Sequence, residues 1–301
     1  MPNVKEGLLR GVITALGTPL DQEGTNLHEE GMRMQVAAQI EAGVNGLLCL
    51  GTMGMAQMHT PAVREQAIRA TVEEAAGRLP VLVGCGDCST ARTRRYMADA
   101  EKYKPDGIVL IAPYFPKLSD EELLDYFVSL AESTSVPIYI YDIPFFTNRP
   151  LSSNFIKTLA GGSRKIVGLK ASGDFAVFRE CVENFREDPH FAVFSGHSPL
   201  LDVATLLGAD GIIDGLFALS PRTGVEIYEA ASRNHVDQAL AAQRKLKDVR
   251  DVVLIESVFA AFSCAMNELG FPGNYACPPF RNITDQGREQ VREKLQQLGM
   301  V

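Results

Sequence analysis

Eight short apolar segments, each followed by a longer stretch of helical character, constrain the fold of this 301-residue chain more than any other feature. The segments are rich in Val, Ile and Leu, as parallel strands are when helices cover both faces of their sheet. From the second segment onward their starts fall about 20 to 34 residues apart, which is the length of a strand–helix unit. They lie at Gly11–Thr18, Gly46–Gly51, Pro80–Gly84, Asp106–Pro113, Pro137–Tyr141, Lys165–Lys170, Phe191–Ser195 and Asp210–Asp214.

Eight such units in series predict an α/β fold, a closed (βα)8 barrel of the TIM type. An open doubly wound sheet is the competing fold, but the Gly-x-Gly-x-x-Gly turn that would favour it does not follow the first segment. Long helical stretches at about 221–232, 235–250, 252–269 and 285–298 predict a C-terminal helical extension. No Ser/Gly-rich linker divides the chain, so we expect one structural unit, with the barrel over residues 1–232 and the extension over 233–301.

The charge balance limits the class of partner. The chain has 37 acidic and 29 basic residues, a formal net charge of −8, and no basic block. This balance argues against nucleic acid and against an anionic membrane surface as partners. No apolar run reaches the roughly 20 residues that span a bilayer, and the N-terminus lacks the features of a signal peptide. We therefore expect a cytoplasmic protein that acts on small molecules.

Cysteine and histidine usage predicts neither disulfides nor a metal site. Six Cys are scattered through the chain, which is typical of reduced thiols, and the five His are isolated from one another. Cys85 and Cys88 form one C-x-x-C pair, but a zinc site would need further ligands at close spacing. We interpret the pair as small residues in a turn after a strand.

Lys170 is the most unusual residue at a predicted strand end. Active sites of these barrels lie at the C-terminal ends of the strands, and Lys170 closes the apolar run that begins at Ile166. Burial disfavours the ammonium form of a Lys and makes available the neutral amine that attacks a carbonyl carbon to form a Schiff base. The alternative is a Lys that extends to solvent at the barrel mouth or pairs with Asp142 or Asp214.

Two further strand ends carry groups that suit imine chemistry. Tyr141 ends the preceding strand, so its side chain meets that of Lys170 if both point inward, and a phenol can relay the protons that imine formation requires. The alternative is an aromatic core residue with its hydroxyl at the rim. The turn Gly51-Thr52-Met53-Gly54 adds a hydroxyl and backbone N–H groups that could bind a carboxylate, although many tight turns share this pattern.

Together these residues resemble the pyruvate-dependent class I aldolases and lyases typified by dihydrodipicolinate synthase and N-acetylneuraminate lyase. The resemblance runs almost from end to end of the chain. The matching segments, in order, are Gly11–Leu16 with Thr18-Pro19, the Gly51–Gly54 turn, Gly84–Thr90, Pro113-Tyr114, Tyr141–Pro144 (the family's Tyr-Asn-x-Pro), Ile166–Lys170, and Pro278–Phe280 with Thr284. Several spaced motifs in the same order are specific as a set.

The resemblance implies a (βα)8 barrel, assembly as a homo-oligomer (usually a homotetramer built from dimers), and neither a metal nor an organic cofactor. By position, Lys170 would form the Schiff base, Tyr141 would relay protons, and Thr52 would relay protons and help bind the keto-acid carboxylate. The backbone N–H groups of Thr52 and Met53 would bind that carboxylate. The residues expected to line the pocket around the reacting carbon are Gly196 and Ile213.

Several positions depart from the family pattern. Phe115 stands in place of a second relay Tyr, Met53 replaces the second hydroxyl of the turn, and Met55 replaces its Glu. Phe145 and Phe146 stand where the synthase has Gly and the Arg that binds a distal carboxylate. An unpaired carboxylate against Phe would be costly, which argues against dihydrodipicolinate synthase itself. We expect these five residues to form an apolar far wall, with Phe146 contacting a neutral or partly apolar electrophile, unless they simply pack a dimer contact.

Three functional hypotheses remain open at this point. The first is an aldolase or lyase in which Lys170 forms an imine with pyruvate or another 2-keto acid, and a C–C bond is made or broken with an aldehyde. The second keeps the same imine but eliminates water from a 3-deoxy-2-keto acid. The third is a barrel that binds a keto acid without catalysis, because part of the proton relay is missing.

Overall fold

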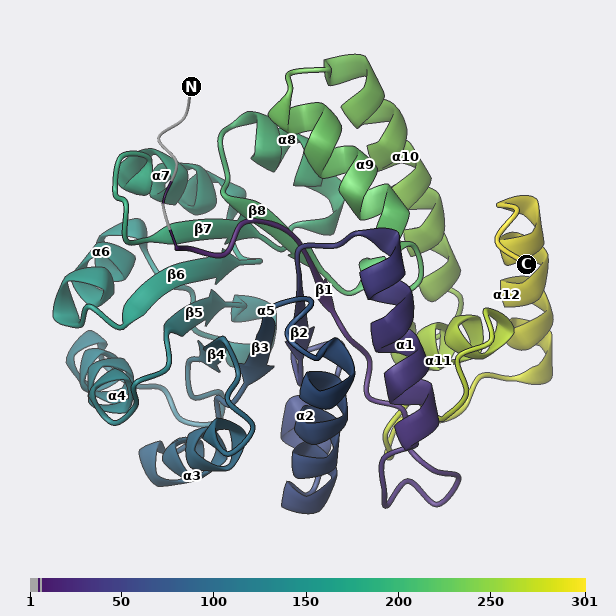
Figure 1. Cartoon of the computed structure of the whole chain (residues 1–301), viewed down its shortest axis with the longest axis horizontal. Coiled ribbons are helices and arrows are strands. Elements are labelled where there is room, and N and C mark those ends of the chain that lie inside the picture. The colour runs from purple at the N-terminus through teal and green to yellow at the C-terminus, as the bar shows by residue number, and fades with distance from the viewer. Residues whose placement is uncertain (1–4, 6) are drawn as a thin grey trace.

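The computed structural model of the chain describes residues 5 and 7–301. Eight parallel strands follow one another in chain order around a closed barrel, which confirms the predicted fold (Figure 1). The strands are β1 (Gly11–Ala15), β2 (Gly46–Cys49), β3 (Val81–Gly84), β4 (Gly107–Ile111), β5 (Ile138–Asp142), β6 (Ile166–Ala171), β7 (Ala192–Ser195) and β8 (Gly211–Asp214).

Helices surround the barrel and continue beyond it as the C-terminal extension. In Figure 1, α10 lies beside α9, and α12 carries the C-terminus away from the strands. The helices are α1 (Glu29–Ala42), α2 (Pro61–Ala75), α3 (Thr90–Glu101), α4 (Asp120–Glu132), α5 (Pro144–Thr147), α6 (Ser153–Gly162), α7 (Phe175–Phe185), α8 (Leu201–Leu206), α9 (Pro221–Ser232), α10 (Val236–Val253), α11 (Val258–Glu268) and α12 (Asp285–Gln297).

Several boundaries differ from the sequence prediction by a few residues; the first strand, for example, ends at Ala15 rather than Thr18. Two of the differences arise because single residues adopt left-handed backbone conformations. The second strand ends at Cys49, since Leu50 has a φ of 57° that extended chain cannot accommodate. The helix expected over 252–269 begins only at Val258, because α10 continues to Val253 and Glu256 then takes a φ of 59°. Both irregular segments lie at the functional end of the barrel.

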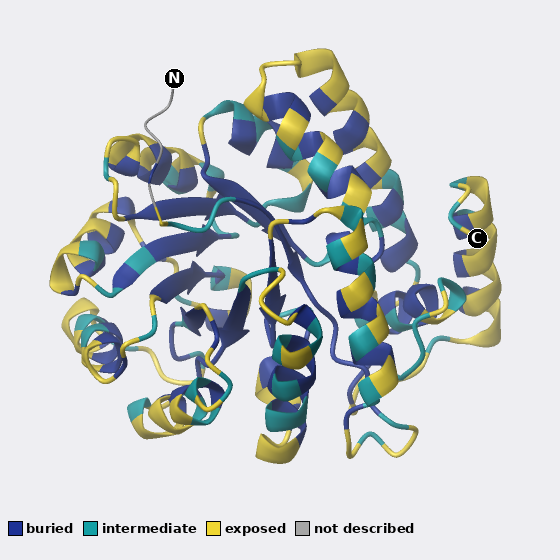
Figure 2. Ribbon diagram, viewed as in Figure 1, coloured by how far each residue is buried: buried dark blue, intermediate teal, exposed yellow. Residues whose placement is uncertain are grey.

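The core has two layers separated by the strands. Inside the barrel, side chains such as Leu48, Tyr139 and Phe194 fill the lumen, and the Tyr139 and Phe194 rings meet edge to face at 6.1 Å. Outside it, a larger cluster joins the strands to the inner faces of the helices. Figure 2 shows the result as buried strands within helices whose outer faces are exposed.

A buried Lys closes the N-terminal end of the barrel. Lys5, which is 5% exposed, donates to Asp210 Oδ2 at 2.8 Å and to the carbonyl oxygens of Phe185 at 2.9 Å and Phe191 at 2.6 Å. Phe191 and Asp210 immediately precede β7 and β8. This network belongs to the stability of the fold, because the chemistry of these barrels lies at the opposite end.

The extension shares the core of the barrel. Leu246 and Val249 of α10 are buried in the same cluster as the outer faces of the strands, and Phe262 of α11 packs edge to face on Tyr275 at 5.8 Å. The segment between α10 and α11 therefore has a fixed place at the barrel mouth. Over the part of the chain that the structure describes, no helix is long and apolar enough to cross a membrane.

Candidate active site

A cavity of about 530 Å³ opens at the C-terminal ends of the strands. Its walls come from the turn after β2, from the ends of β5 to β8, and from the α10–α11 segment. The seven site residues proposed from the sequence all line it: Thr52, Met53, Tyr141, Phe146, Lys170, Gly196 and Ile213. The fold thus brings together residues that lie up to 161 positions apart in the chain.

Lys170 lies inside the barrel mouth rather than extending to solvent. It is only 4% exposed, and it pairs in register with Tyr141 of the neighbouring strand β5. Its Nζ atom is 4.1 Å from the centroid of the Tyr141 ring. Tyr141 as a residue is 5% exposed. A compact, largely buried amine held against a phenol at the base of an open cavity has the surroundings that a Schiff-base nucleophile requires.

Thr52 completes a short chain of hydroxyl groups. Its Oγ1 lies 3.5 Å from the Tyr141 hydroxyl, at the outer limit of a hydrogen bond and in the range that substrate binding commonly shortens. The left-handed Leu50 turns the chain so that Thr52 and Met53 face the cavity. Within the described residues, the backbone N–H groups of Thr52 and Met53 have no hydrogen-bond partner, so they are available to an anion.

Gly196 makes room for the Lys170 side chain. A Cβ atom at this position would stand 3.1 Å from Lys170 Cε and 2.3 Å from Ser172 Oγ. The Ser172 hydroxyl donates to the Gly196 carbonyl at 3.1 Å, which fixes the turn after β7 against β6. Glycine is therefore needed here by close approach, and its place in the pocket agrees with the family position.

Asp214 is a cavity residue that the sequence suggested only as an ion-pair partner for Lys170. It ends β8, is 5% exposed, and accepts hydrogen bonds from the Ser198 hydroxyl and, at 2.8 Å, from the Leu216 N–H. Burial raises the pKa of Asp214, while these hydrogen bonds and the nearby Lys170 charge oppose the rise. No ion pair within 4.0 Å joins Asp214 to Lys170 in the described chain, so the Lys amine is not held in a salt bridge.

The neighbouring Asp142 is buried but lies outside the cavity lining. It is 4% exposed, and its Oδ1 accepts one hydrogen bond from the Leu151 N–H at 3.2 Å. Burial raises the pKa of Asp142 to about 6, and that single hydrogen bond only partly opposes the rise. The alternative of a Lys170–Asp142 pair is not observed among the described residues.

The apolar wall is smaller than the sequence predicted. Met53 packs against Gly215, and the Phe145 and Phe146 rings meet edge to face at 5.0 Å beside the cavity. The expectation was wrong for two residues. Met55 packs beneath the turn in a cluster with Leu20, Val63 and Cys277, and Phe115 is 91% exposed and does not line the cavity.

The sequence analysis missed the wall that the C-terminal extension supplies. Arg250, Leu254, Ser257 and Val258 line the cavity from α10, α11 and the turn between them. The buried Nε atom of Arg250 has no hydrogen-bond partner in the described chain. No sequence feature marks this wall, because residues 254–257 lie within the stretch 252–269, whose whole pattern is helical.

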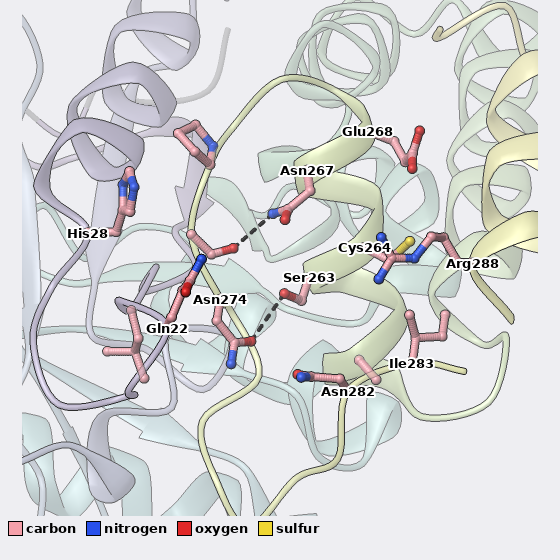
Figure 3. Close-up of a pocket in the computed structure, with 14 residues that line it drawn as sticks. Gln22, His28, Ser263, Cys264, Asn267, Glu268, Asn274, Asn282, Ile283 and Arg288 are labelled. Atoms are coloured by element: carbon pink, nitrogen blue, oxygen red, sulfur yellow. Dashed lines mark hydrogen bonds between the residues drawn. The ribbon is translucent and has the colours of Figure 1, made fainter. Parts of the chain in front are cut away.

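A separate cavity of about 590 Å³ lies between α11, the start of α1 and the segment that follows α11 (Figure 3). Its amide and hydroxyl groups are largely engaged with one another. Asn267 Nδ2 donates to the Gly273 carbonyl at 2.8 Å, and Ser263 Oγ lies 3.4 Å from Asn274 Oδ1. This cavity has no Lys among its lining residues and therefore no amine that could form a Schiff base, so we place the active site at Lys170.

Potential metal ligands are dispersed. In residues 5 and 7–301, no group of three or more His, Cys, Asp or Glu side chains is arranged to hold a metal ion. All six cysteines are free thiols, and Cys85 is fully buried behind β3 with its pKa raised by burial to about 12.

Comparison with known proteins places this arrangement in a family. Residues 8–298 match the model of the dihydrodipicolinate synthetase family. The chain belongs to that family. It is 30% identical over 294 residues to 4-hydroxy-tetrahydrodipicolinate synthase of Methanopyrus kandleri, with 97% of each chain covered. It is 31% identical over 301 residues to the Escherichia coli protein named "Probable 2-dehydro-3-deoxy-D-pentonate aldolase YjhH", covering 97% of this chain and 98% of the other.

The solved structures agree with the family assignment. The crystal structure of E. coli YagE in complex with pyruvate superposes with a TM-score of 0.91 at 28% identity, covering 98% of this chain and all of the other. The family resemblance inferred from the motifs is therefore confirmed. Synthases and aldolases of the family share this level of identity with the chain, so overall similarity does not select between their substrates.

Proposed function

We propose that the protein is a Schiff-base-forming aldolase, a carbon–carbon lyase that acts on pyruvate or a closely related 2-keto acid together with an aldehyde. The observation that carries this proposal is Lys170, 4% exposed at the end of β6, with its amine against the Tyr141 ring in a cavity of about 530 Å³. Family membership and the aldolase names among its relatives support the same reaction class.

The first half-reaction forms an imine. The neutral Lys170 amine attacks C2 of the keto acid, whose carboxylate accepts hydrogen bonds from the free N–H groups of Thr52 and Met53. The Tyr141 hydroxyl protonates the carbinolamine oxygen, and water leaves as the C=N bond forms. Thr52 resupplies the proton across the 3.5 Å separation between the two hydroxyls.

The second half-reaction makes or breaks the C–C bond. Loss of a C3 proton converts the imine to an enamine, whose C3 attacks the aldehyde carbon while the aldehyde oxygen takes up a proton. Addition of water to the resulting imine releases the product and restores the Lys170 amine. The cleavage direction follows the same steps in reverse. Because the imine nitrogen on Lys170 accepts the electron pair released at C3, we infer that neither a metal nor an organic cofactor is required.

Reductive trapping tests the proposal directly. Incubation with pyruvate and borohydride should add one reduced pyruvate per chain, and peptide mapping should place it on Lys170. The Lys170→Ala variant should give no adduct while retaining its thermal unfolding transition. The absence of an adduct in the native protein would refute the imine, and an adduct on another residue would refute the assignment. Product analysis then separates aldol cleavage from dehydration.

We also infer that the protein assembles as a homo-oligomer, usually a tetramer in this family, and that it acts in the cytoplasm. Phe115 and Phe145 support the first inference, because they are 91% and 83% exposed near the strand ends and large aromatic side chains are costly to leave in water. Light scattering of the purified protein measures the oligomeric state. A monomer at micromolar concentration would overturn the inference.

A further inference from the structure

Arg250 is a charged side chain in the catalytic cavity without a partner. It lies three residues before the end of α10 and lines the cavity that holds Lys170. Its Nε atom is buried and makes no hydrogen bond, and in the described chain no carboxylate lies within ion-pairing distance of its guanidinium. The adjacent Asp251 is paired with Lys247 at 2.7 Å. The guanidinium therefore has donors to offer to a ligand.

The other buried polar atoms that lack partners have no such position. In the described residues there are two, Arg149 Nε and the Tyr275 hydroxyl. The Arg149 guanidinium is already paired with Asp120, and Tyr275 is fully enclosed beside Phe262 in the core. Neither lines the Lys170 cavity. The unsatisfied donor at the reaction site is thus that of Arg250, and a buried donor without a partner destabilises the protein unless a ligand satisfies it.

The surroundings of Arg250 favour an anion on an apolar body. Val253, Leu254 and Val258 line the cavity beside it, and Phe145 and Phe146 supply further apolar wall. The one carboxylate of this cavity, Asp214, is already bound by Ser198 and the Leu216 N–H. An apolar neighbourhood lowers the local dielectric constant, so a guanidinium there attracts an anionic oxygen group strongly.

We propose that Arg250 binds an anionic group, a carboxylate or a phosphate, at the distal end of the aldehyde partner. The preferred electrophile is then an aldehyde with an apolar body and an anionic tail, and Arg250 is a specificity-determining residue. This inference rests on the proposed aldolase reaction. It departs from the neutral electrophile expected from Phe146, because the sequence reasoning did not include Arg250 in the cavity wall.

The test compares aldehydes that differ only in the anionic tail. With pyruvate as donor, kcat/KM is measured for 4-oxobutanoate against butanal and for 4-carboxybenzaldehyde against benzaldehyde, with 4-formylphenyl phosphate as the phosphate arm. The native protein should prefer an anionic member over its neutral counterpart. Arg250→Gln should reduce that preference by about 10- to 150-fold, as expected for a hydrogen bond to a charged group, and Arg250→Lys should restore part of it.

The matched control is Arg244→Gln, which removes the same charge from an exposed position of the same helix. It should leave the preference unchanged, which separates local binding from the general field of the protein. Equal kcat/KM values for the charged and the neutral aldehyde in the native protein would overturn the role of Arg250. A native protein that consumes neither aldehyde of a pair would overturn it as well. So would an equal loss in both glutamine variants. Failure of pyruvate trapping would instead refute the aldolase reaction itself, so the two failures are distinguishable.

Discussion

Replacing Asp142 by Asn should stabilise the protein by an amount that grows as the pH rises from 3.8 to about 6 and is constant above that range. The pKa of Asp142 rises from 3.8 to about 6 because burial disfavours the carboxylate and one N–H opposes this only in part. Above pH 6 the carboxyl is ionised in both the folded and the unfolded chain, so the folded state is destabilised by the full free energy of burying a carboxylate. Below pH 3.8 it is protonated in both, and the cost disappears.

The expected gain follows from the difference between the two pKa values. About 2.2 pH units correspond to an upper limit of about 3 kcal/mol. With about 2.1 cal/mol/K per residue of unfolding entropy, this raises Tm by about 4 to 5 °C in a chain of this length. Asn keeps an oxygen for the Leu151 N–H, and the family motif carries Asn at this position.

Calorimetry or circular dichroism at pH 4, 5, 6 and 8 measures the effect. The Tm gain of Asp142→Asn should be small at pH 4, about half of its maximum at pH 5, and nearly complete from pH 6 to pH 8. Asp125→Asn, at an exposed position of α4, is the matched control and should change Tm little at any pH. A gain that is independent of pH, or a loss at pH 8, would refute the electrostatic reasoning.

Three further substitutions test the site and the fold. Tyr141→Phe should slow borohydride trapping of pyruvate by about 100- to 10,000-fold, the range of a lost proton relay, with unchanged Tm; normal trapping would exclude Tyr141 as the relay. Gly196→Ala should reduce trapping at least about tenfold, since the new Cβ would lie 2.3 Å from Ser172 Oγ. Adding Ser172→Ala removes that oxygen and should recover part of the loss; a double variant as slow as Gly196→Ala would contradict the steric explanation. Lys5→Met should lower the free energy of unfolding by about 3–5 kcal/mol, because the buried Asp210 carboxylate would keep only the Val193 N–H and the more distant Arg10 as partners. Urea titration measures this loss, and an unchanged free energy would contradict a structural role for Lys5.

Most of the fold could be predicted because its signal repeats. Eight apolar segments at strand–helix spacing admit few arrangements, and the helices needed only approximate limits. What the pattern could not specify were the single left-handed residues. Leu50 and Glu256 have no composition that marks them, yet they end β2 early and separate α10 from α11. Such conformations depend on tertiary contacts that periodicity does not encode.

The candidate site could be predicted to the extent that it lies on strand ends. Lys170 and Tyr141 are adjacent because sequential barrel strands are neighbours, and their register followed from the fold alone. Met55 and Phe115 were misplaced because their side chains leave the turns in directions that sequence position does not determine. Arg250 was missed because the extension that carries it had no expected contact with the barrel mouth.

The cavity of this chain has a guanidinium on one wall and Phe146 at the place where the synthase motif carries an Arg. The family's synthases carry that Arg after the Tyr-Asn-x-Pro segment, where this chain has Phe146, so a distal carboxylate on that side would lie unpaired against a ring. Here the guanidinium comes from α10 instead, on the wall that the C-terminal extension builds. The imine chemistry depends only on Lys170, Tyr141 and Thr52. These residues are the same whether the Arg follows the Tyr-Asn-x-Pro segment or lies on α10. With Arg250 as the anion-binding group, the same imine chemistry would act on aldehydes whose anionic end points toward α10 rather than toward Phe146.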